Sequence, residues 1–386
     1  MHILKVQDRY SEKEFFQFPS QLYQGTAQWI QTMPHEEEGA FDPEQNPLLK
    51  EGEACRWILQ KNRGKTIGRV AAFNDRRGET ATGFLGFFEC IEHNQAANKL
   101  LGEGVYWLGS QGIEVVNAPV NPNSLFLKAG LLTEGFDELP VYGSNYHPAY
   151  YQSFFESFGF EKHFRQRTHQ IDFQTMPLPK SVKEKANAII NSDGFRIDRF
   201  CKEKAESLSQ DIALVYNQTW SGKPYYNELS AQQIQAELLE LLPWIDEGVF
   251  LLAYYHDQPV GFFFNLPNIN YTRKRAGKGL FRKMREAYFR NQQHKHLLSV
   301  LLGVLPEFQQ RGVASALIKT VLDFLSKHEI RYDKIEINRV SDDQTAIQHL
   351  LQQFKGEPHQ HYWVYRKSIP ITQSIKVNQE SATLKQ

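Results

Sequence analysis

The sequence predicts an α/β fold that is built twice along one chain. At about 150 residues per domain, its 386 residues correspond to two or three domains. Each half contains a hairpin pattern, in which two β-rich apolar runs flank turn residues at 62–65 and at 256–259. In each half a strand, a turn, a helix and a further strand follow the hairpin. The matching order and spacing of these elements indicate a duplication.

The elements of the first half are read from its apolar runs. The two hairpin strands lie within residues 54–75, and a third apolar strand follows at 83–91. Residues 96–112 predict the helix, and 113–120 predict the next strand. Gly68 in this hairpin and Gly261 in the second lie at matching places, 193 residues apart, which supports the duplication.

The second half repeats this order with clearer signals. Its hairpin occupies 248–268, and the nearly continuous apolar run at 297–305 predicts a central strand buried on both faces. Pro306 has no N–H to donate, so the strand is expected to end or splay there. Apolar residues at helical spacing over 313–329 predict a helix packed on the sheet, and 333–340 predict a strand. This half also carries a longer insertion, roughly at 270–296.

These patterns divide the chain into four segments. We expect a first domain at 1–175 and a second domain at 193–369. Between them, residues 176–192 combine prolines with a short charged helical pattern, which indicates a linker with a bridging helix. The polar tail at 370–386 is expected to be disordered.

Composition excludes several classes of protein. The 44 basic and 44 acidic residues cancel, which argues against a whole-surface field for nucleic acid or membrane. No run approaches the roughly 18 apolar residues of a membrane span, and the N-terminus lacks the pattern of a signal peptide. Three widely spaced cysteines argue against a disulfide framework and a cysteine-rich zinc site. We therefore expect a cytoplasmic protein without a metal, a nucleic-acid partner or a membrane partner; its oligomeric state stays open.

The strongest local signal is the turn between the strand at 297–305 and the helix at 313–329. Gly312 allows close approach of an anion to the backbone, and the N–H groups of 310–314 point outward at a helix N-terminus. Arg311 could add a charge-assisted contact. The turn is neither a Walker A loop nor a G-x-G-x-x-G fingerprint. It predicts a phosphate-binding site of another kind.

Gln309-x-x-Gly312-x-Ala314 resembles the pyrophosphate motif of the GNAT acetyltransferase superfamily, whose pattern is Gln/Arg-x-x-Gly-x-Gly/Ala. The preceding residues 303–307 are similar to the end of that superfamily's cofactor strand. The resemblance covers about 193–368; the first half has the same layout, but Glu92 and Gln95 stand where Gln309 and Gly312 do. The runs at 86–89, 130–140 and 148–160 resemble two-domain bacterial GNAT-like proteins without an assigned substrate.

This resemblance implies two tandem GNAT-like domains, each a mixed, mostly antiparallel sheet flanked by helices, with one active cofactor site. It implies an acetyl-CoA-dependent N-acetyltransferase that acts on a small-molecule or peptide amine, which attacks the thioester directly. A backbone N–H near Val304 or Leu305 would stabilise the oxyanion. The residues implied in cofactor binding are Val304, Leu305, Gln309, Gln310, Arg311, Gly312, Val313 and Ala314. Two alternatives stay open: a non-catalytic acyl-CoA-binding or sensor module, and a Fem-like aminoacyl transferase.

The sequence departs from the superfamily at the group that protonates the leaving thiolate. Where a Tyr often follows an Asn-x-x-Ala pattern, this chain has Leu350. Tyr362, on the next strand, is the substitute we assign as general acid, although packing in the sheet explains it too. Glu336 is the candidate general base, although a solvated strand carboxylate is an equally simple interpretation.

Two further patterns have simpler explanations. The histidine pairs 294/296 and 359/361 lack neighbours at zinc-ligand spacing, so we expect them to be solvated. Residues 272–285 hold seven basic residues and no acid, above an apolar helical stripe. We interpret this as a solvated amphipathic helix whose apolar stripe packs inward; an acidic partner or the cofactor's 3′-phosphate is the alternative. The stripe consists of Leu280, Phe281, Met284, Ala287 and Tyr288.

Overall fold

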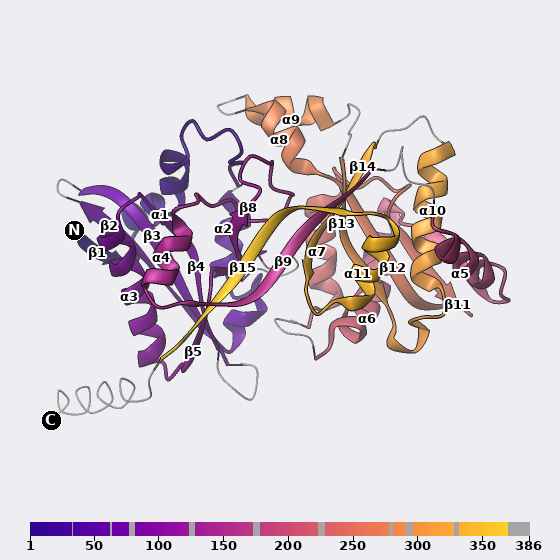
Figure 1. Cartoon of the computed structure of the whole chain (residues 1–386), viewed down its shortest axis with the longest axis horizontal. Helices are drawn as coiled ribbons and strands as arrows, with labels where there is room; N and C mark the ends of the chain where they lie inside the picture. Colours follow the sequence, from indigo (N-terminus) through magenta and orange to yellow (C-terminus); the bar gives the residue numbers. More distant parts are fainter. Residues whose placement is uncertain are drawn as a thin grey trace. The chain divides into compact units, whose positions relative to one another are not determined.

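The computed structural model describes residues 1–32, 34–61, 64–76, 82–122, 128–172, 178–222, 228–277, 281–290, 296–327 and 332–369. The chain divides into two compact units (Figure 1). Unit 1 comprises residues 1–166 and 360–386, and unit 2 comprises 167–359. The tail expected to be disordered, 370–386, lies outside the described residues.

Two long strands change unit along their length. Strand β9 (Glu161–Asp172) begins in unit 1 and ends in unit 2, whereas β15 (Glu357–Ser368) begins in unit 2 and ends in unit 1. The boundaries predicted from sequence took each domain as one continuous segment. An apolar pattern marks a strand but does not show which half it completes, so this exchange has no sequence signal.

The sheet of unit 1 is antiparallel except for one parallel pair, β4 with β5. Short strands complete the unit: β8 (Leu131–Glu134) pairs with β15, and β6 (Val120–Asn121) pairs with β7 (Lys128–Ala129). The strand order is β1 (His2–Lys5), β2 (Glu53–Lys61), β3 (Lys65–Asp75), β4 (Thr82–Cys90), β5 (Val115–Ala118) and β15.

Helices α1 (Arg9–Leu22) and α3 (Asn94–Ser110) cover opposite faces of this sheet. A Cβ at Gly68 would meet Leu100 of α3, whereas Arg69, the next residue of β3, donates to the Phe15 carbonyl of α1. Successive strand residues face opposite sides, so the two helices do as well. The remaining helices of the unit are short: α2 (Pro34–Glu38), α4 (Tyr151–Ser157) and two 3₁₀ turns, Gly39–Phe41 and Pro47–Lys50.

The sheet of unit 2 repeats this plan. It is antiparallel from β10 to β13, and β13 then pairs in parallel with β14. The strand order is the end of β9, then β14 (Lys334–Ser341), β13 (His296–Val304), β12 (Gln258–Pro267), β11 (Leu251–Tyr255) and β10 (Phe195–Arg199). The strands of both units belong to one continuous sheet, and the prediction of a mixed, mostly antiparallel strand arrangement flanked by helices in each half is confirmed.

Helices α6 (Ala205–Trp220) and α10 (Val313–Lys327) cover opposite faces of the unit 2 sheet. A Cβ at Gly261 would meet Val313 of α10, and one at Gly303 would meet Trp220 of α6. Gly68 and Gly261 therefore have the same role, since each lets the helix of its half pack on β3 or β12. The other helices are α5 (Lys180–Ile190), α7 (Ala231–Leu241), α8 (Ile269–Ala276), α9 (Arg282–Arg290) and α11 (Thr345–Gln353), with 3₁₀ turns at Lys202–Lys204 and Pro306–Phe308.

Candidate functional site

Strands β13 and β14 pair over a short length and then diverge. Their parallel register runs from His296↔Lys334 to Ser299↔Ile337. Strand β13 continues along β12 to the pair Val304↔Gly261, past a bulge at which the register shifts. The two strands therefore open a splay whose closed end lies at Ser299 and whose open end leads to the turn before α10.

Of the two predicted oxyanion donors, the structure leaves only Val304. The Leu305 N–H donates to the Val260 carbonyl at 3.0 Å, so the prediction that Leu305 could hold the thioester carbonyl is wrong. Backbone groups of successive strand residues point to alternate edges, so the Val304 N–H is directed toward the splay. The Val304 carbonyl on that edge accepts hydrogen bonds from Thr219 and from the Gln309 side chain.

The turn that follows has two residues in the left-handed region. Gln310 has φ 63° and Gly312 has φ 96°, and the Gly312 carbonyl accepts the Ala316 N–H that begins α10. Gly312 carries no side chain that could cap the N–H groups of Val313 and Ala314. Gln310 and Arg311 are exposed. Such a turn at a helix N-terminus is a concave set of donors suited to an anion.

Two members of the predicted cofactor set have structural roles in this turn. The Gln309 amide donates to the Val304 carbonyl at 3.1 Å and closes the turn onto the strand. The Arg311 N–H donates to the Phe308 carbonyl at 3.4 Å, and its guanidinium lies 5.4 Å from the Phe308 ring centroid. The expectation that all five N–H groups of 310–314 point outward is therefore wrong for Arg311.

Glycine at 312 is required by packing. A Cβ there would lie 2.5 Å from the Lys185 carbonyl oxygen of α5, the helix predicted for the linker. Gly312 is itself buried against α5, so a side chain at this position has no space. A substitution at 312 would disturb folding and binding together.

Glu336 lies at the closed end of the splay. It pairs with Leu298, one position before the last pair of β13 and β14. Its side chain is fully buried, which excludes the interpretation of a solvated carboxylate. Asn268 donates to one carboxylate oxygen at 2.5 Å, and Tyr271 donates to the other at 3.3 Å. The predicted base is thus held in an ordered polar cluster.

His296 completes this cluster. Its Nδ1 lies 3.2 Å from the Glu336 carboxylate, and its ring stacks on Tyr271 with centroids 4.0 Å apart. When Nδ1 donates to the carboxylate, Nε2 remains as a proton acceptor. The side chain retains 19% exposure, so the expectation of a solvated histidine is wrong. Sequence reasoning missed His296, Asn268 and Tyr271 because no motif links residues 40 to 68 positions from Glu336 along the chain.

Arg339 adds a cation on the diverging part of β14. It has φ 54°, a left-handed conformation within the strand. Burial lowers its pKa to about 10, while the neighbouring Tyr216 has the opposite effect. The guanidinium therefore stays charged at neutral pH.

Tyr362, the candidate general acid, lies in unit 1 and not in the unit of the turn. It pairs with Leu132, and its hydroxyl donates to Gln360 at 3.3 Å. Burial raises the pKa of the phenol well above its usual range, although a hydrogen bond with Ser144 lowers it. The structure does not bring Tyr362 together with Glu336 within one unit, and its role stays a prediction.

In unit 1, the positions that correspond to the splay and to the start of α10 are filled by other segments of the chain. The pairing of β4 with β5 ends at Phe84↔Asn117, and β6 then lies against β4. The Asn121 side chain accepts the N–H of Phe87, a left-handed residue, at 2.7 Å. At the start of α3, the His93 side chain accepts the Ala96 N–H.

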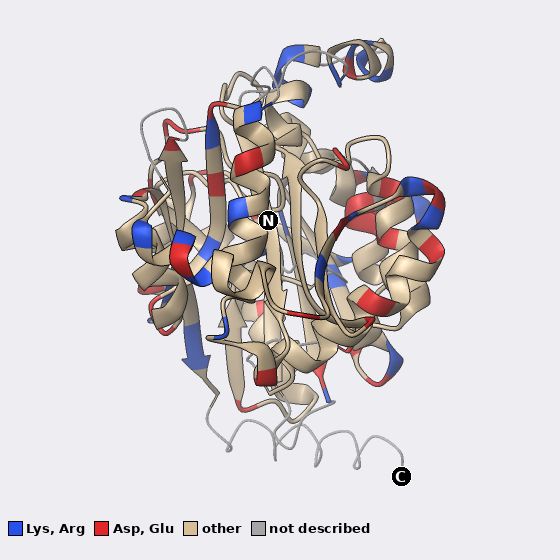
Figure 2. Cartoon of the chain, turned by 90° about the vertical axis from the view of Figure 1, so that its right-hand side faces the viewer, with Lys and Arg blue, Asp and Glu red and all other residues tan. Residues whose placement is uncertain are grey.

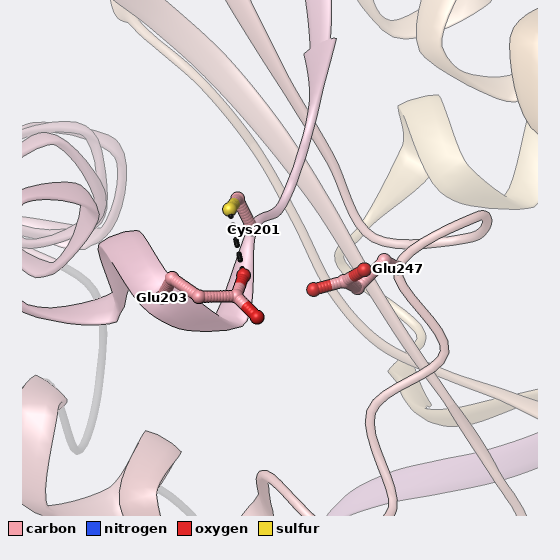
Figure 3. A group of neighbouring side chains, drawn as sticks. All are labelled: Cys201, Glu203 and Glu247. Carbon is pink, nitrogen blue, oxygen red and sulfur yellow. Dashed lines mark hydrogen bonds between the residues drawn. The ribbon is translucent and has the colours of Figure 1, made fainter.

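One group of potential metal ligands stands out among the described residues. Cys201, Glu203 and Glu247 have ligand atoms within 4.8 Å of one another (Figure 3). The Cys201 thiol donates to Glu203, and Glu247 accepts the Lys202 N–H, so each of the three groups has a hydrogen-bond partner within the protein. They adjoin an open cavity of about 500 Å³ that Phe324 also lines. Among the described residues, no contact links this group or its cavity to the splay.

Comparisons with known proteins match the part of the chain that holds the turn and the splay to a known family. The acetyltransferase (GNAT) family model matches residues 214–356. Protein YghO of Escherichia coli K12 is 24% identical and covers 92% of this chain and 93% of its own length. The bacterial ceramide synthase of Caulobacter vibrioides is 22% identical and covers 96% of this chain and 98% of its own length.

Solved structures show the same architecture. A tandem GNAT protein from the clavulanic acid biosynthesis pathway has a TM-score of 0.55 at 9% identity and covers 95% of this chain and 98% of its own. A GCN5-related N-acetyltransferase from Anabaena variabilis has a TM-score of 0.52 at 10% identity, covering 96% of this chain and 74% of its own. Residues 214–356 therefore match the acetyltransferase (GNAT) family, and the chain as a whole has the fold of tandem GNAT proteins.

Proposed function

We propose that unit 2 transfers an acyl group from a coenzyme A thioester to an amine. The observation that carries this proposal is the splay between β13 and β14, which opens onto the left-handed turn before α10. The GNAT motif resemblance and the family match over 214–356 support it. The N–H donors of the turn and the splay both lie in unit 2. The proposal therefore requires no particular arrangement of unit 1 relative to unit 2.

The acyl-CoA would bind along this path. Backbone N–H groups of Val313 and Ala314 and the exposed Arg311 would hold the pyrophosphate, and the pantetheine arm would enter the splay. Eight strand residues, roughly 26 Å, separate Val304 from His296, so the Val304 N–H would donate to the pantetheine arm. An N–H of β13 nearer the closed end of the splay would donate to the thioester carbonyl and stabilise the oxyanion that forms on attack. No metal takes part in this scheme.

Proton transfer is assigned to the pair His296–Glu336. The amine gives a proton to His296 Nε2 as its nitrogen attacks the thioester carbon, while Glu336 holds Nδ1 and stabilises the imidazolium. The C–S bond then breaks, and the same proton passes to the CoA thiolate. One histidine thus acts first as base and then as acid, which removes the need for a tyrosine at Leu350.

Two acyl donors are candidates. The sequence motif points to acetyl-CoA and a small-molecule or peptide amine. The full-length similarity to a ceramide synthase favours a longer acyl chain and an amphiphilic amine, since ceramide is the N-acyl amide of a long-chain amino alcohol.

A matrix of donors and acceptors tests the function. Acetyl-CoA and palmitoyl-CoA are each combined with small amines, lysine peptides and a long-chain amino alcohol, and released CoA thiol and amide product are measured. We expect amide formation with one donor class and a stoichiometric release of thiol. Binding of acyl-CoA without turnover across the matrix would instead favour the sensor module, and turnover that requires aminoacyl-tRNA would favour the Fem-like transferase.

A further inference from the structure

The insertion between β12 and β13 carries a concentrated positive charge on a neutral chain. Residues 272–290 hold eight basic side chains and one acidic one, Glu286. Helices α8 and α9 form this insertion, and Figure 2 shows basic residues along the helix pair at the top of the view. Charge that is balanced over the whole chain is therefore strongly unbalanced here.

The apolar stripe of α9 is not packed inward. Phe281 is 60% exposed, Met284 is 71% exposed and Tyr288 is 66% exposed. The sequence predicted that this stripe packs beneath the basic residues; Leu280, its first member, lies outside the described part of the chain. The spacing of three and four residues places the three exposed side chains on one face of the helix.

Basic side chains accompany this apolar face. Lys274, Arg275 and Lys283 are exposed. The Arg275 guanidinium lies 4.6 Å from the Phe289 ring centroid, which joins α8 to α9. Glu286, the one acid, is buried and paired with Arg282 at 2.6 Å, so it does not oppose the exposed cations.

We propose that α8 and α9 dock on the surface of a membrane that contains anionic lipids. A helix with a cationic face beside exposed aromatic and methionine side chains inserts the apolar groups at the headgroup boundary while its cations contact lipid phosphates. Nucleic acid matches the cations but offers no apolar layer for Met284 and Tyr288. An acidic protein is a third partner class, and the vesicle experiment below separates it from lipid.

The same insertion reaches the acid–base cluster. Asn268 caps α8 and donates to Glu336, and Tyr271 of α8 stacks on His296. Docking through α9 would therefore bring a membrane surface next to the element that orders the cluster. This link rests on the proposed function and points to an amine acceptor that resides in the lipid layer.

Vesicle co-sedimentation of the full chain tests the docking. The probes are phosphatidylcholine vesicles with and without about 30% phosphatidylglycerol. We expect binding to the anionic vesicles that weakens with salt, and little binding to the neutral ones. Changing Phe281, Met284 and Tyr288 together to Ser should reduce binding about tenfold or more, and Lys274→Glu with Lys283→Glu should do the same.

The matched control changes Tyr10, Tyr106 and Leu239 to Ser, because these side chains are also more than half exposed but lie on α1, α3 and α7. Absence of binding to anionic vesicles, or an equal loss in the control, would overturn the inference. Amide formation with the donors and acceptors of the matrix, the long-chain amino alcohol included, is measured in parallel with the same variants. If an amine is acylated without vesicle binding, only the docking is wrong; if vesicle binding persists and no combination of donor and acceptor gives an amide, the proposed function is wrong.

Discussion

At the scale of single residues, Gly312 combines an observed packing role with its proposed role in binding. Gly312→Ala forces a Cβ toward the Lys185 carbonyl and a side chain into φ 96°. We expect the free energy of unfolding to fall by about 1–3 kcal/mol, as measured by chemical denaturation. Gly25→Ala is the control, since it has φ 87° but nothing within 4 Å. An equal loss in both variants would show that the contact with α5 contributes nothing.

Arg311 allows the anion site to be tested without disturbing the core. Arg311→Glu places a negative charge at the exposed turn and should weaken acyl-CoA binding about tenfold to a hundredfold, because a charge-assisted contact becomes repulsive. Calorimetric titration with CoA measures this. Lys13→Glu, the same charge change on exposed α1, should leave the affinity unchanged. Equal affinities of wild type and Arg311→Glu would remove Arg311 from the site.

The proton-transfer assignment concerns His296 and Glu336. Glu336→Gln keeps the shape but cannot stabilise the imidazolium, so we expect kcat to fall about a hundredfold or more while CoA affinity stays nearly constant. His296→Gln should have a similar effect. Tyr362→Phe separates the two hypotheses, because the sequence-based assignment predicts a loss of kcat and the histidine assignment predicts none. Full activity of His296→Gln would contradict our scheme.

At the scale of elements, the two halves differ in what fills the splay. Strand β6 occupies it in unit 1, where Asn121 satisfies the Phe87 N–H. Asn121→Ala would leave that buried N–H without an acceptor and should lower the free energy of unfolding by about 1–3 kcal/mol. Thermal and urea unfolding of the variant measure the change. An unchanged stability would mean that the splay of unit 1 is open to water.

Buried charge also distinguishes the halves. Arg69, 1% exposed, pairs with Glu37 at 2.8 Å and with Glu89 at 2.5 Å, whereas β12 has the apolar Phe262 at the matching position after its glycine. Arg69→Leu would leave two carboxylates uncompensated. We expect a loss of about 3–5 kcal/mol in urea unfolding. If the stability is unchanged, water must solvate these carboxylates.

The elements also show how far sequence reasoning reaches. The hairpins, α3, α10 and the strand before the turn were predictable, because apolar periodicity and Pro306 are local signals. The cluster of His296, Tyr271 and Asn268 around Glu336 was not, since it depends on how the insertion folds back on β14. The exposed face of α9 was predicted as buried, because periodicity shows that a stripe exists but not what covers it.

At the scale of the whole molecule, the sequence revealed the duplication of the two halves but not the exchange of strands between the units. Matching glycines and element order revealed the duplication. The exchange of β9 and β15 between units left no trace, because both strands carry ordinary apolar patterns. No helix among the described residues is long and apolar enough to cross a membrane.

The number of acyl-CoA molecules bound per chain tests the central claim most directly. One unit has an open splay that leads to the turn proposed to hold the pyrophosphate, whereas the other has a splay filled by β6 and a helix start capped by His93. Isothermal titration of the intact chain with acetyl-CoA, repeated with palmitoyl-CoA, should give about one site with at least one of the two donors. Two equivalent sites, or no binding of either donor by folded protein, would contradict the account.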